Sequence, residues 1–274
     1  MLNFIRIFSE SEFIGKGYFR YVFSLYLKFF PIRYLERWLY LNPQDTGLAS
    51  QLISNNYETY TNYVMNKMIK RNFVIVDIGS HVGDNMIHFS QLVGEFGKVY
   101  CFEPNLDNYL LLQKNISINK ISNVIAINSA VSDNNGMVNL IISHNDTTNH
   151  RISKAGIYGN SVVRIRSDSL DNLLYNRDKI DLIKIDVQGW EIKCVLGMKK
   201  IIDQNSPTLI IEYWPKGLKD SGFEPQELLT VLHRKKYKIY VLDEVKMVTS
   251  FIKSISELNK YIENVSFVNL LCSK

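Results

Sequence analysis

Four short apolar runs, each with an acidic residue near its end, restrict the fold of this chain more than any other feature of its sequence. They are FVIVDIG (residues 73–79), KVYCFEP (98–104), DLIKIDV (181–187) and TLIIEYW (208–214). Short apolar runs that alternate with segments of helical periodicity are typical of buried parallel strands. The pattern therefore predicts an α/β fold with a doubly wound sheet built from right-handed βαβ units.

Apolar patterning also predicts the remaining elements. Further strands are expected at residues 124–131, 138–143, 162–167, 237–242 and 266–273, and helices at 57–70, from the turn after residue 83 to about 93, and at 107–119, 169–175, 189–203, 224–235 and 256–263. Acidic residues lie at the carboxyl ends of four predicted strands, namely Asp77, Glu103, Asp186 and Glu212. Open α/β sheets bind ligands at this edge, where the strand order reverses, so we expect the chemistry there.

The turn Asp77-Ile78-Gly79-Ser80-His81-Val82-Gly83 suits a ligand that approaches the backbone closely, because two glycines tolerate sharp turns. It lacks the Gly-x-Gly-x-x-Gly spacing that cradles a pyrophosphate. Glu103 ends the next strand, where a carboxylate accepts hydrogen bonds from both hydroxyls of a ribose. Turn and acid together indicate a nucleoside, and a cationic one such as S-adenosylmethionine fits better than NAD. An ordinary strand-to-helix turn and a free strand-end acid are the alternatives.

The segment Lys184-Ile185-Asp186-Val187-Gln188-Gly189-Trp190-Glu191 carries a second group of polar residues. Lys184 and Asp186 are two apart on a predicted strand, so their side chains share a face. Gly189 permits a tight turn, and Glu191 lies in the first turn of the next helix, where the helix dipole favours an anion. Asp186 is thus a candidate base, with capping of the turn as its alternative role.

The combination of these motifs resembles the FkbM family of methyltransferases. The matching segments, in order, are VIVDIGSHVGDN, VYCFEPNLDNYLLLQKNI, SAVSD, SLDNLL, IDLIKIDVQGWEIKCVLGM, TLIIEYWP and the closing VNLLCSK. The resemblance implies a class I, Rossmann-like methyltransferase fold with a doubly wound sheet of seven strands. These strands are mostly parallel, and the last of the seven is antiparallel to the others. It also implies S-adenosylmethionine as cofactor and O-methylation of a hydroxyl on a sugar, a glycan or glycolipid precursor, or a secondary metabolite.

The resemblance implies a role for each matching residue. The cofactor loop comprises Asp77, Gly79, Ser80, His81 and Gly83; Glu103 holds the ribose; Pro104 and Asn105 lie beside the adenosine; Ser129, Ala130 and Val131 border the adenine; Asp186 lies where methyl donor and acceptor meet; and Glu58 closes the pocket. The chain departs from the family at Ser80 and His81, which replace a small residue and Asn, and at Gln188, which replaces Glu. Gln188 retains hydrogen bonding but removes a charge, which puts a base role there in doubt.

Methyl transfer from a sulfonium requires alignment of the acceptor oxygen and a destination for its proton. Asp186 is the first candidate for the base, and Lys184 would orient it or lower its pKa. Glu212 has two open interpretations, substrate contact and a structural role. His144 and His150 in the polar loop 143–161 are expected either to reach over the pocket as a base or to be solvated. The three cysteines are widely spaced, and the His, Asp and Glu residues do not show the spacing of metal ligands. We therefore expect no zinc site and no other required metal.

Two other functions remain open at this point. Methylation of nucleic acid is disfavoured because the chain lacks the Asn/Asp-Pro-Pro-Tyr/Phe motif of base N-methylation and any RNA-binding module. A non-catalytic binding subunit that retains the fold is disfavoured by the intact motif residues. A net charge of +5 does not by itself indicate nucleic acid.

The N-terminal residues differ from the rest of the chain in composition. Of 33 aromatic residues, 13 lie in residues 1–42, together with six basic residues. We expect residues 1–46 to form a helical extension in two pieces, the second starting at Pro31, and residues 47–274 to form the methyltransferase domain. The extension is expected to pack on the domain, to form a homo-oligomer interface or to touch a membrane. No signal peptide or transmembrane helix is predicted, which favours a cytoplasmic protein, with peripheral membrane contact as an option.

Overall fold

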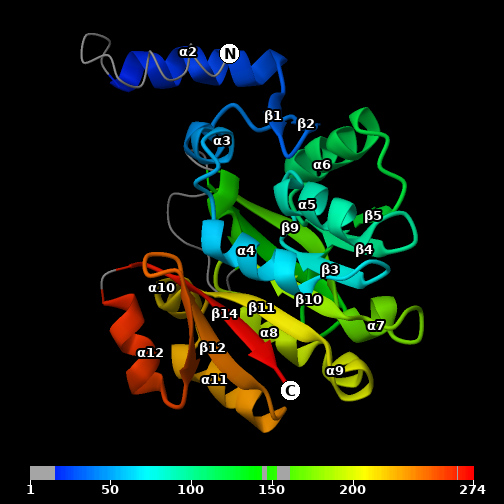
Figure 1. Cartoon of the computed structure of the whole chain (residues 1–274), viewed down its shortest axis with the longest axis vertical. Helices are drawn as coiled ribbons and strands as arrows, with labels where there is room; N and C mark the ends of the chain where they lie inside the picture. Colours follow the sequence, from blue (N-terminus) through cyan, green and yellow to red (C-terminus); the bar gives the residue numbers. More distant parts are fainter. Residues whose placement is uncertain (1–15, 144–146, 153–160, 264) are drawn as a thin grey trace.

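The computed structural model describes residues 16–143, 147–152, 161–263 and 265–274, and its centre is an eight-stranded sheet with helices on both faces (Figure 1). The strands, in spatial order, are β13 (Val248–Ile252), β12 (Lys238–Asp243), β14 (Val268–Ser273), β11 (Thr208–Tyr213), β10 (Leu182–Ile185), β3 (Val74–Ile78), β4 (Lys98–Phe102) and β5 (Val124–Ile127). Strand β14 runs antiparallel to both of its neighbours, whereas β11, β10, β3, β4 and β5 are parallel. The predicted fold class is confirmed, with β13 added as an eighth strand at the edge.

Alternate residues of the central strands feed two separate cores, as expected for a sheet covered on both sides. Val76 and Ile183 belong to one core, and Ile75 and Leu182 belong to the other. The first core includes α7 (Leu170–Leu174), α8 (Glu191–Leu196), α9 (Lys199–Asn205), α10 (Pro215–Asp220), α11 (Pro225–Arg234) and α12 (Ile255–Ile262). The second includes α2 (Lys16–Phe29), α3 (Thr46–Ile53), α4 (Thr59–Met68), α5 (Asp84–Val93) and α6 (Leu106–Ile118).

A second, four-stranded sheet lies beside the carboxyl ends of the central strands. Its order is β6 (Ala130–Val131), β9 (Ser161–Asp168), β7 (Gly136–Ile142) and β8 (Arg151–Ile152). The predicted strand 124–131 is therefore divided between the two sheets, because the chain leaves the central sheet at Asn128 and Ser129. The strands predicted at 138–143 and 162–167 correspond to β7 and β9, which pair antiparallel.

Residues 32–39 form a β-hairpin, and the prediction of a second helical piece from Pro31 is wrong. Strands β1 (Ile32–Tyr34) and β2 (Arg37–Leu39) alternate buried and exposed side chains, and the turn residues Leu35 and Glu36 have positive φ. Two asparagine side chains, Asn115 in α6 and Asn119 at its C-cap, hydrogen-bond the backbone of β2 and of the residue that follows it. Asn119 bonds both the N–H and the carbonyl of Trp38, and Asn115 does the same for Tyr40. The hairpin is thereby bound to the sheet domain.

Helix α2 stands at one end of the molecule, above α3 and the hairpin (Figure 1). The predicted boundary after residue 46 falls in the first turn of α3 and stays a prediction. Within the described residues, no helix is long and apolar enough to cross a membrane.

Candidate active site

The turn after β3 approaches the end of β10 so closely that only glycine fits at its first residue, Gly79. Gly79 has φ +87°, and a Cβ placed on it would lie 1.8 Å from the carbonyl oxygen of Asp186. The N–H of Asp186 in turn donates to the carbonyl of Ile78 at 3.0 Å. These contacts bring the loop from Asp77 to Gly83 and the end of β10 into one site, as the sequence predicted from their positions at strand ends.

Glu103 holds this loop from the neighbouring strand. Its Oε2 accepts the backbone N–H of His81 at 2.9 Å, and its Oε1 accepts the N–H of Asn105 at 2.8 Å. Burial raises the pKa of Glu103 to about 7, although the charge of His81 and the two N–H groups oppose that shift. Each carboxylate oxygen retains a further lone pair for a ligand hydroxyl.

A narrow cavity opens next to Glu103, and the second sheet covers it. The apolar side chains of Phe102, Leu140 and Ile152 are part of its lining. Predicted cofactor residues also line it, namely Gly79, His81, Glu103, Pro104, Ser129, Ala130, Val131 and Asp186. His150 lines it too, and its Nδ1 accepts the backbone N–H of Ser143 at 3.1 Å.

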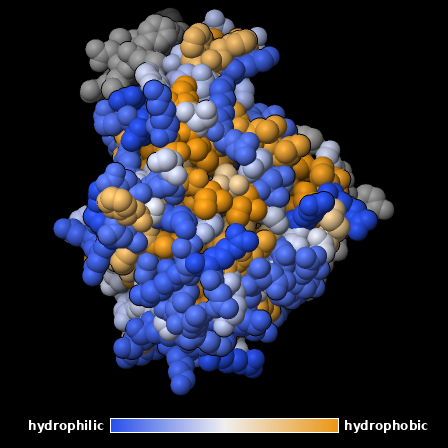
Figure 2. Space-filling view, turned by 90° about the vertical axis from the view of Figure 1, so that its right-hand side faces the viewer, coloured by the Kyte–Doolittle hydropathy of each residue, from blue (hydrophilic) through white to orange (hydrophobic). Residues whose placement is uncertain are grey.

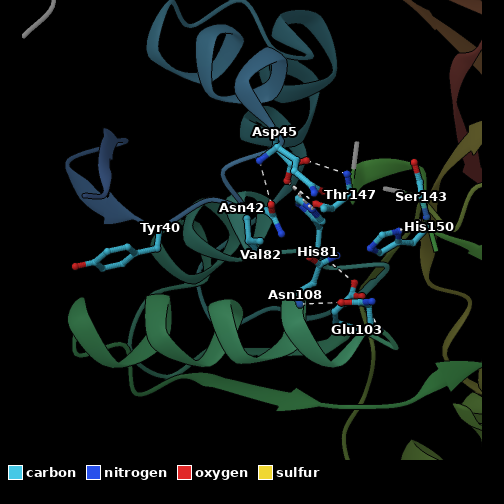
Figure 3. A network of polar contacts seen from close by, with 12 residues as sticks. Tyr40, Asn42, Asp45, His81, Val82, Glu103, Asn108, Ser143, Thr147 and His150 are labelled. Atoms are coloured by element: carbon cyan, nitrogen blue, oxygen red, sulfur yellow. Dashed lines mark hydrogen bonds and ion pairs between the residues drawn. The ribbon is translucent and has the colours of Figure 1, made fainter. Parts of the chain in front are cut away.

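His81 joins this cavity to a polar network that sequence reasoning missed (Figure 3). Its Nε2 lies 2.8 Å from Thr147 Oγ1 and 3.3 Å from Asp45 Oδ2, and both the N–H and the hydroxyl of Thr147 donate to Asp45. Burial alone would lower the pKa of His81, but the hydrogen bond and charge of Asp45 raise it above the ordinary value. These contacts tie the loop from Asp77 to Gly83 to the chain just before α3 and to the η1 turn (Thr147–Asn149).

A second cavity, of about 600 Å³, lies on the other side of Gly79 and His81. Four acids line it, namely Asp45, Asp84, Asp186 and Glu212. The aromatic side chains of Tyr57, Trp214 and Phe267 line other parts of its wall. The two cavities share Gly79, His81, Thr148, Asp186 and Gln188, so they meet at the end of β10.

A buried ammonium group lies beneath this junction among several carboxylates. Lys184 is 2% exposed, and its Nζ donates to Asp186 Oδ2 at 2.9 Å. Burial alone would lower the pKa of Lys184, but the charges of Asp186, Glu58 and Asp77 raise it well above the ordinary value. Lys184 therefore keeps its positive charge and orients Asp186 toward the junction.

Among the described residues, neither carboxylate oxygen of Asp77 has a hydrogen-bond partner, although both atoms are buried. Burial raises its pKa to about 7, against the opposing charge of Lys184. Glu58 differs in that its Oε1 accepts from Asn269 at 2.9 Å, whereas its buried Oε2 has no partner in the described part of the chain. More carboxylates than cations surround Lys184 in the described site, which leaves a negative region next to the cavities.

Gln188 bridges two carboxylates at the junction. Its Nε2 lies 3.0 Å from Asp186 Oδ1 and 3.0 Å from Glu212 Oε1. Burial and the charge of Asp186 raise the pKa of Glu212 well above its ordinary value. An amide at this position donates to both acids, whereas a third carboxylate would repel them. The departure from the family motif at Gln188 is thus compatible with an intact site.

Five predicted cofactor residues line neither of these two cavities; Asp77 and Glu58 are two of them, and the other three shape the loops. Ser80 Oγ donates to the carbonyl of Asp77, Gly83 precedes α5 with φ +96°, and the side chain of Asn105 caps α6. Glu58 lies buried behind Lys184 and is also absent from the described cavity walls. His144 lies outside the described residues. Among the residues that are described, no group of three His, Cys, Asp or Glu side chains is arranged to hold a metal ion.

A sequence profile of the methyltransferase FkbM domain matches residues 77–239, which is more than half of the chain. The chain belongs to the FkbM methyltransferase family. The smaller cavity, the Gly79 turn and Glu103 all lie within the segment that defines FkbM membership, and the resemblance inferred from the motifs is confirmed. No curated protein matched the sequence.

Several solved structures resemble this FkbM chain. The FkbM methyltransferase of Methylobacillus flagellatus KT is 16% identical with a TM-score of 0.45, over 84% of this chain and 55% of that one. The precorrin-6y C5,15-methyltransferase of Geobacter metallireducens GS-15 is 10% identical with a TM-score of 0.45, over 79% and 87%. Aeropyrum pernix fibrillarin, solved with S-adenosylmethionine bound, is 10% identical with a TM-score of 0.46, over 78% and 73%. Likeness at this level says nothing about the acceptor, and family membership rests on the matched domain.

Proposed function

We propose that this chain transfers the methyl group of S-adenosylmethionine to a hydroxyl oxygen of an acceptor bound in the larger cavity. The observation that carries the proposal is the junction of the two cavities at Gly79, His81, Asp186 and Gln188. One cavity is narrow and partly apolar, and it contains the strand-end acid expected at a ribose. The other is wide and polar. A donor in the first and an acceptor in the second would meet beside the Asp186 carboxylate.

The residues around the smaller cavity fit a cationic nucleoside. Glu103 has lone pairs left for two ribose hydroxyls, and Ala130 and Val131 offer apolar surface to a base. The unpartnered carboxylate of Asp77 and the surplus of acids around Lys184 favour a ligand that carries positive charge. When bound, S-adenosylmethionine would supply a methyl group already activated on a sulfonium.

The acceptor hydroxyl would be held and deprotonated by groups of this chain. Asp186 Oδ2 is bound by Lys184 and Oδ1 by Gln188, so the carboxylate is fixed in one orientation at the junction. We assign it to accept the hydroxyl proton as the new oxygen–methyl bond forms and the sulfur–methyl bond breaks. Because the donor carries the leaving group, the remaining work of the chain is alignment, exclusion of water and removal of that proton.

The larger cavity suits an uncharged polyhydroxy acceptor, such as a sugar of a glycan or glycolipid precursor. Carboxylates accept hydrogen bonds from several hydroxyls, and the flat faces of Tyr57 and Trp214 can pack against a sugar ring. The described wall contains four acids but only two arginine or lysine side chains, Arg20 and Lys216, and an excess of acids disfavours a polyanion such as a nucleic acid in this cavity.

A transfer assay tests the proposal directly. The purified chain is incubated with S-adenosylmethionine labelled in its methyl group and with extracts of glycans, glycolipids or RNA. We expect label in a carbohydrate-containing fraction, bound as an ether that resists mild base. Label found only in RNA, or cofactor binding without turnover on any fraction, would contradict the assignment.

Affinity for S-adenosylmethionine is expected to increase as pH rises through 7. Asp77 and Glu103 both have a pKa of about 7, raised by burial, and each attracts or accepts from the ligand better once ionised. Calorimetry across this range measures the effect. Asp77→Asn should weaken binding above pH 7 and flatten the profile, whereas an unchanged profile would show that Asp77 does not face the bound charge.

Gln188→Glu is expected to make stability decrease with pH. The change places a third carboxylate between Asp186 and Glu212 and removes both bridging hydrogen bonds. One of the three acids must then keep a proton in the folded state, so its pKa is raised and folding is penalised as pH rises above its unfolded value. Thermal melts should show that the melting temperature of the variant falls below that of the parent by an amount that increases from about pH 5 to about pH 8. If the difference in melting temperature does not change with pH, the side chain at position 188 does not couple Asp186 and Glu212.

A further inference from the structure

The backbone of His81 is held in the left-handed region, with φ +48°. A residue with a Cβ adopts this region at a cost, so other contacts must hold it there. One is the N–H of His81, which donates to Glu103 Oε2 at 2.9 Å. The other is the imidazole, which contacts Thr147 and Asp45 (Figure 3). The backbone conformation that presents this N–H to Glu103 is thus secured at the far end of the same side chain.

The hydrogen bonds place a proton on the imidazole nitrogen that contacts Thr147. The Thr147 hydroxyl has one hydrogen, which it donates to Asp45 Oδ2. The contact of 2.8 Å between His81 Nε2 and Thr147 Oγ1 is then a hydrogen bond only if Nε2 donates. The neutral ring with its proton on Nε2 and the positively charged ring both meet this condition. The hold on His81 therefore does not depend on the charge of the ring.

Asp45 anchors this arrangement and does not cap its own helix. It lies at the N-cap of α3, where an aspartate usually accepts an N–H of the first turn, but its side chain makes no such bond. Its two carboxylate oxygens accept instead from the N–H and the hydroxyl of Thr147. Polar side chains cover much of the molecular face in Figure 2, whereas the side chain of Asp45 is 0% exposed. A buried carboxylate is costly unless it is paired, so these contacts fix Asp45 in place beside His81.

We propose that Asp45 is a positioning residue for the cofactor. Through the imidazole of His81 it keeps the His81 N–H against Glu103, and so keeps the Glu103 carboxylate, which lines the smaller cavity, in one orientation. Asp45 is not among the described residues that line this cavity, and it precedes the matched domain, residues 77–239. The inference rests on the proposed function, which places the ribose of S-adenosylmethionine at Glu103.

Calorimetry with S-adenosylmethionine and with S-adenosylhomocysteine, which remains after methyl transfer, tests the proposal. Both ligands contain the ribose, but only the first has a sulfonium. We expect Asp45→Asn to weaken the binding of both by about tenfold, because an amide cannot accept from both donors of Thr147. Weaker binding of S-adenosylmethionine alone would mean that Asp45 acts through its charge, and the positioning role would be wrong.

Asp181→Asn is the matched control. Asp181 Oδ2 accepts the N–H of Val74 at 2.9 Å, so this acid also joins segments that are distant in the chain. It lies at the other end of the strands from Glu103, because it precedes β10. The control should bind both ligands like the parent. A loss equal to that of Asp45→Asn would indicate a general effect on the fold and would overturn the proposal.

A second background shows whether Asp45 acts through His81. Asparagine visits the left-handed region readily, so His81→Asn should still bind measurably without the imidazole contacts. In this background Asp45→Asn should change either Kd by less than about twofold. The proposal fails if the loss is as large as in the parent, or if His81→Asn alone abolishes binding, since the imidazole would then contact the ligand itself.

Thermal melts without ligand show whether Asp45→Asn is folded. If it is not, Thr147→Val tests the same link, because it removes the hydroxyl between Asp45 and His81 and keeps the volume. It should weaken both ligands by about fivefold, and Thr147→Ser should recover that loss. Binding by Thr147→Val equal to that of the parent would overturn the inference, whereas a parent that binds neither ligand would refute the proposed function on which it rests.

Discussion

Replacement of Asp186 by Asn is expected to lower kcat for methyl transfer by about a thousandfold, within the range for loss of a positioned general base. Asn is the same size as Asp and can still occupy the place between Lys184 and Gln188, but it does not accept a proton. The change removes one carboxylate from a region with several, so the Kd for S-adenosylmethionine should weaken by no more than about tenfold.

Asp178→Asn provides the matched control. Asp178 is bound to Lys98 at 2.9 Å, as Asp186 is bound to Lys184 at 2.9 Å. The control pair lies at the start of a strand, because Lys98 is the first residue of β4, whereas Asp186 follows the end of β10. This control should leave kcat unchanged. If Asp186→Asn retains full turnover while it still binds cofactor, the proton goes elsewhere and the assignment of Asp186 as base is wrong.

The second large effect is expected for Glu103→Gln, which should weaken the binding of S-adenosylmethionine by about a hundredfold. Two causes act together. The variant loses charge-assisted acceptance from the ribose, and its amide cannot accept from both backbone N–H groups that Glu103 now binds. One of those N–H groups would face an N–H₂, and the cofactor loop at His81 would lose its hold.

Asp107→Asn separates these effects from a simple change of net charge, because Asp107 is an exposed acid in the first turn of the next helix. Calorimetry at pH 8 compares all three proteins, and a melt of each without ligand reports the loss of the loop clamp. Unchanged affinity in Glu103→Gln would remove Glu103 from the cofactor site, whatever the effect on stability.

The part of the structure that the sequence predicted best is the edge of the central sheet. Asp77, Glu103, Asp186 and Glu212 each end or follow an apolar strand, and neighbouring parallel strands bring their ends together without any knowledge of loops. The Gly79 turn was also predictable, because few residues other than glycine fit a positive φ against a neighbouring backbone. The hairpin at residues 32–39 was missed because aromatic residues obscured its alternating pattern.

Contacts between distant segments were beyond prediction from a single sequence. Asp45 and Thr147 are 102 residues apart, and each reads locally as a turn residue with no chemistry of its own. Only the fold brings them to His81. The second sheet was not predicted either. Strand β6 follows β5 after two residues, so the sequence of both strands looks like one continuous apolar run. Gln188 was visible as a departure from the family motif, but its position between two acids depends on the packing of β11 beside β10.

The walls of the two cavities have different origins in the chain. All residues that line the smaller cavity lie within the matched domain, residues 77–239. Nine of the twenty residues that line the larger cavity lie outside it, in the segments before β3 and just before β14. On the proposed assignment, the donor site lies wholly within the matched domain, whereas the flanking segments contribute nine of the twenty residues of the acceptor site. A change in those flanking segments would then alter the acceptor site without replacing any residue that lines the donor site.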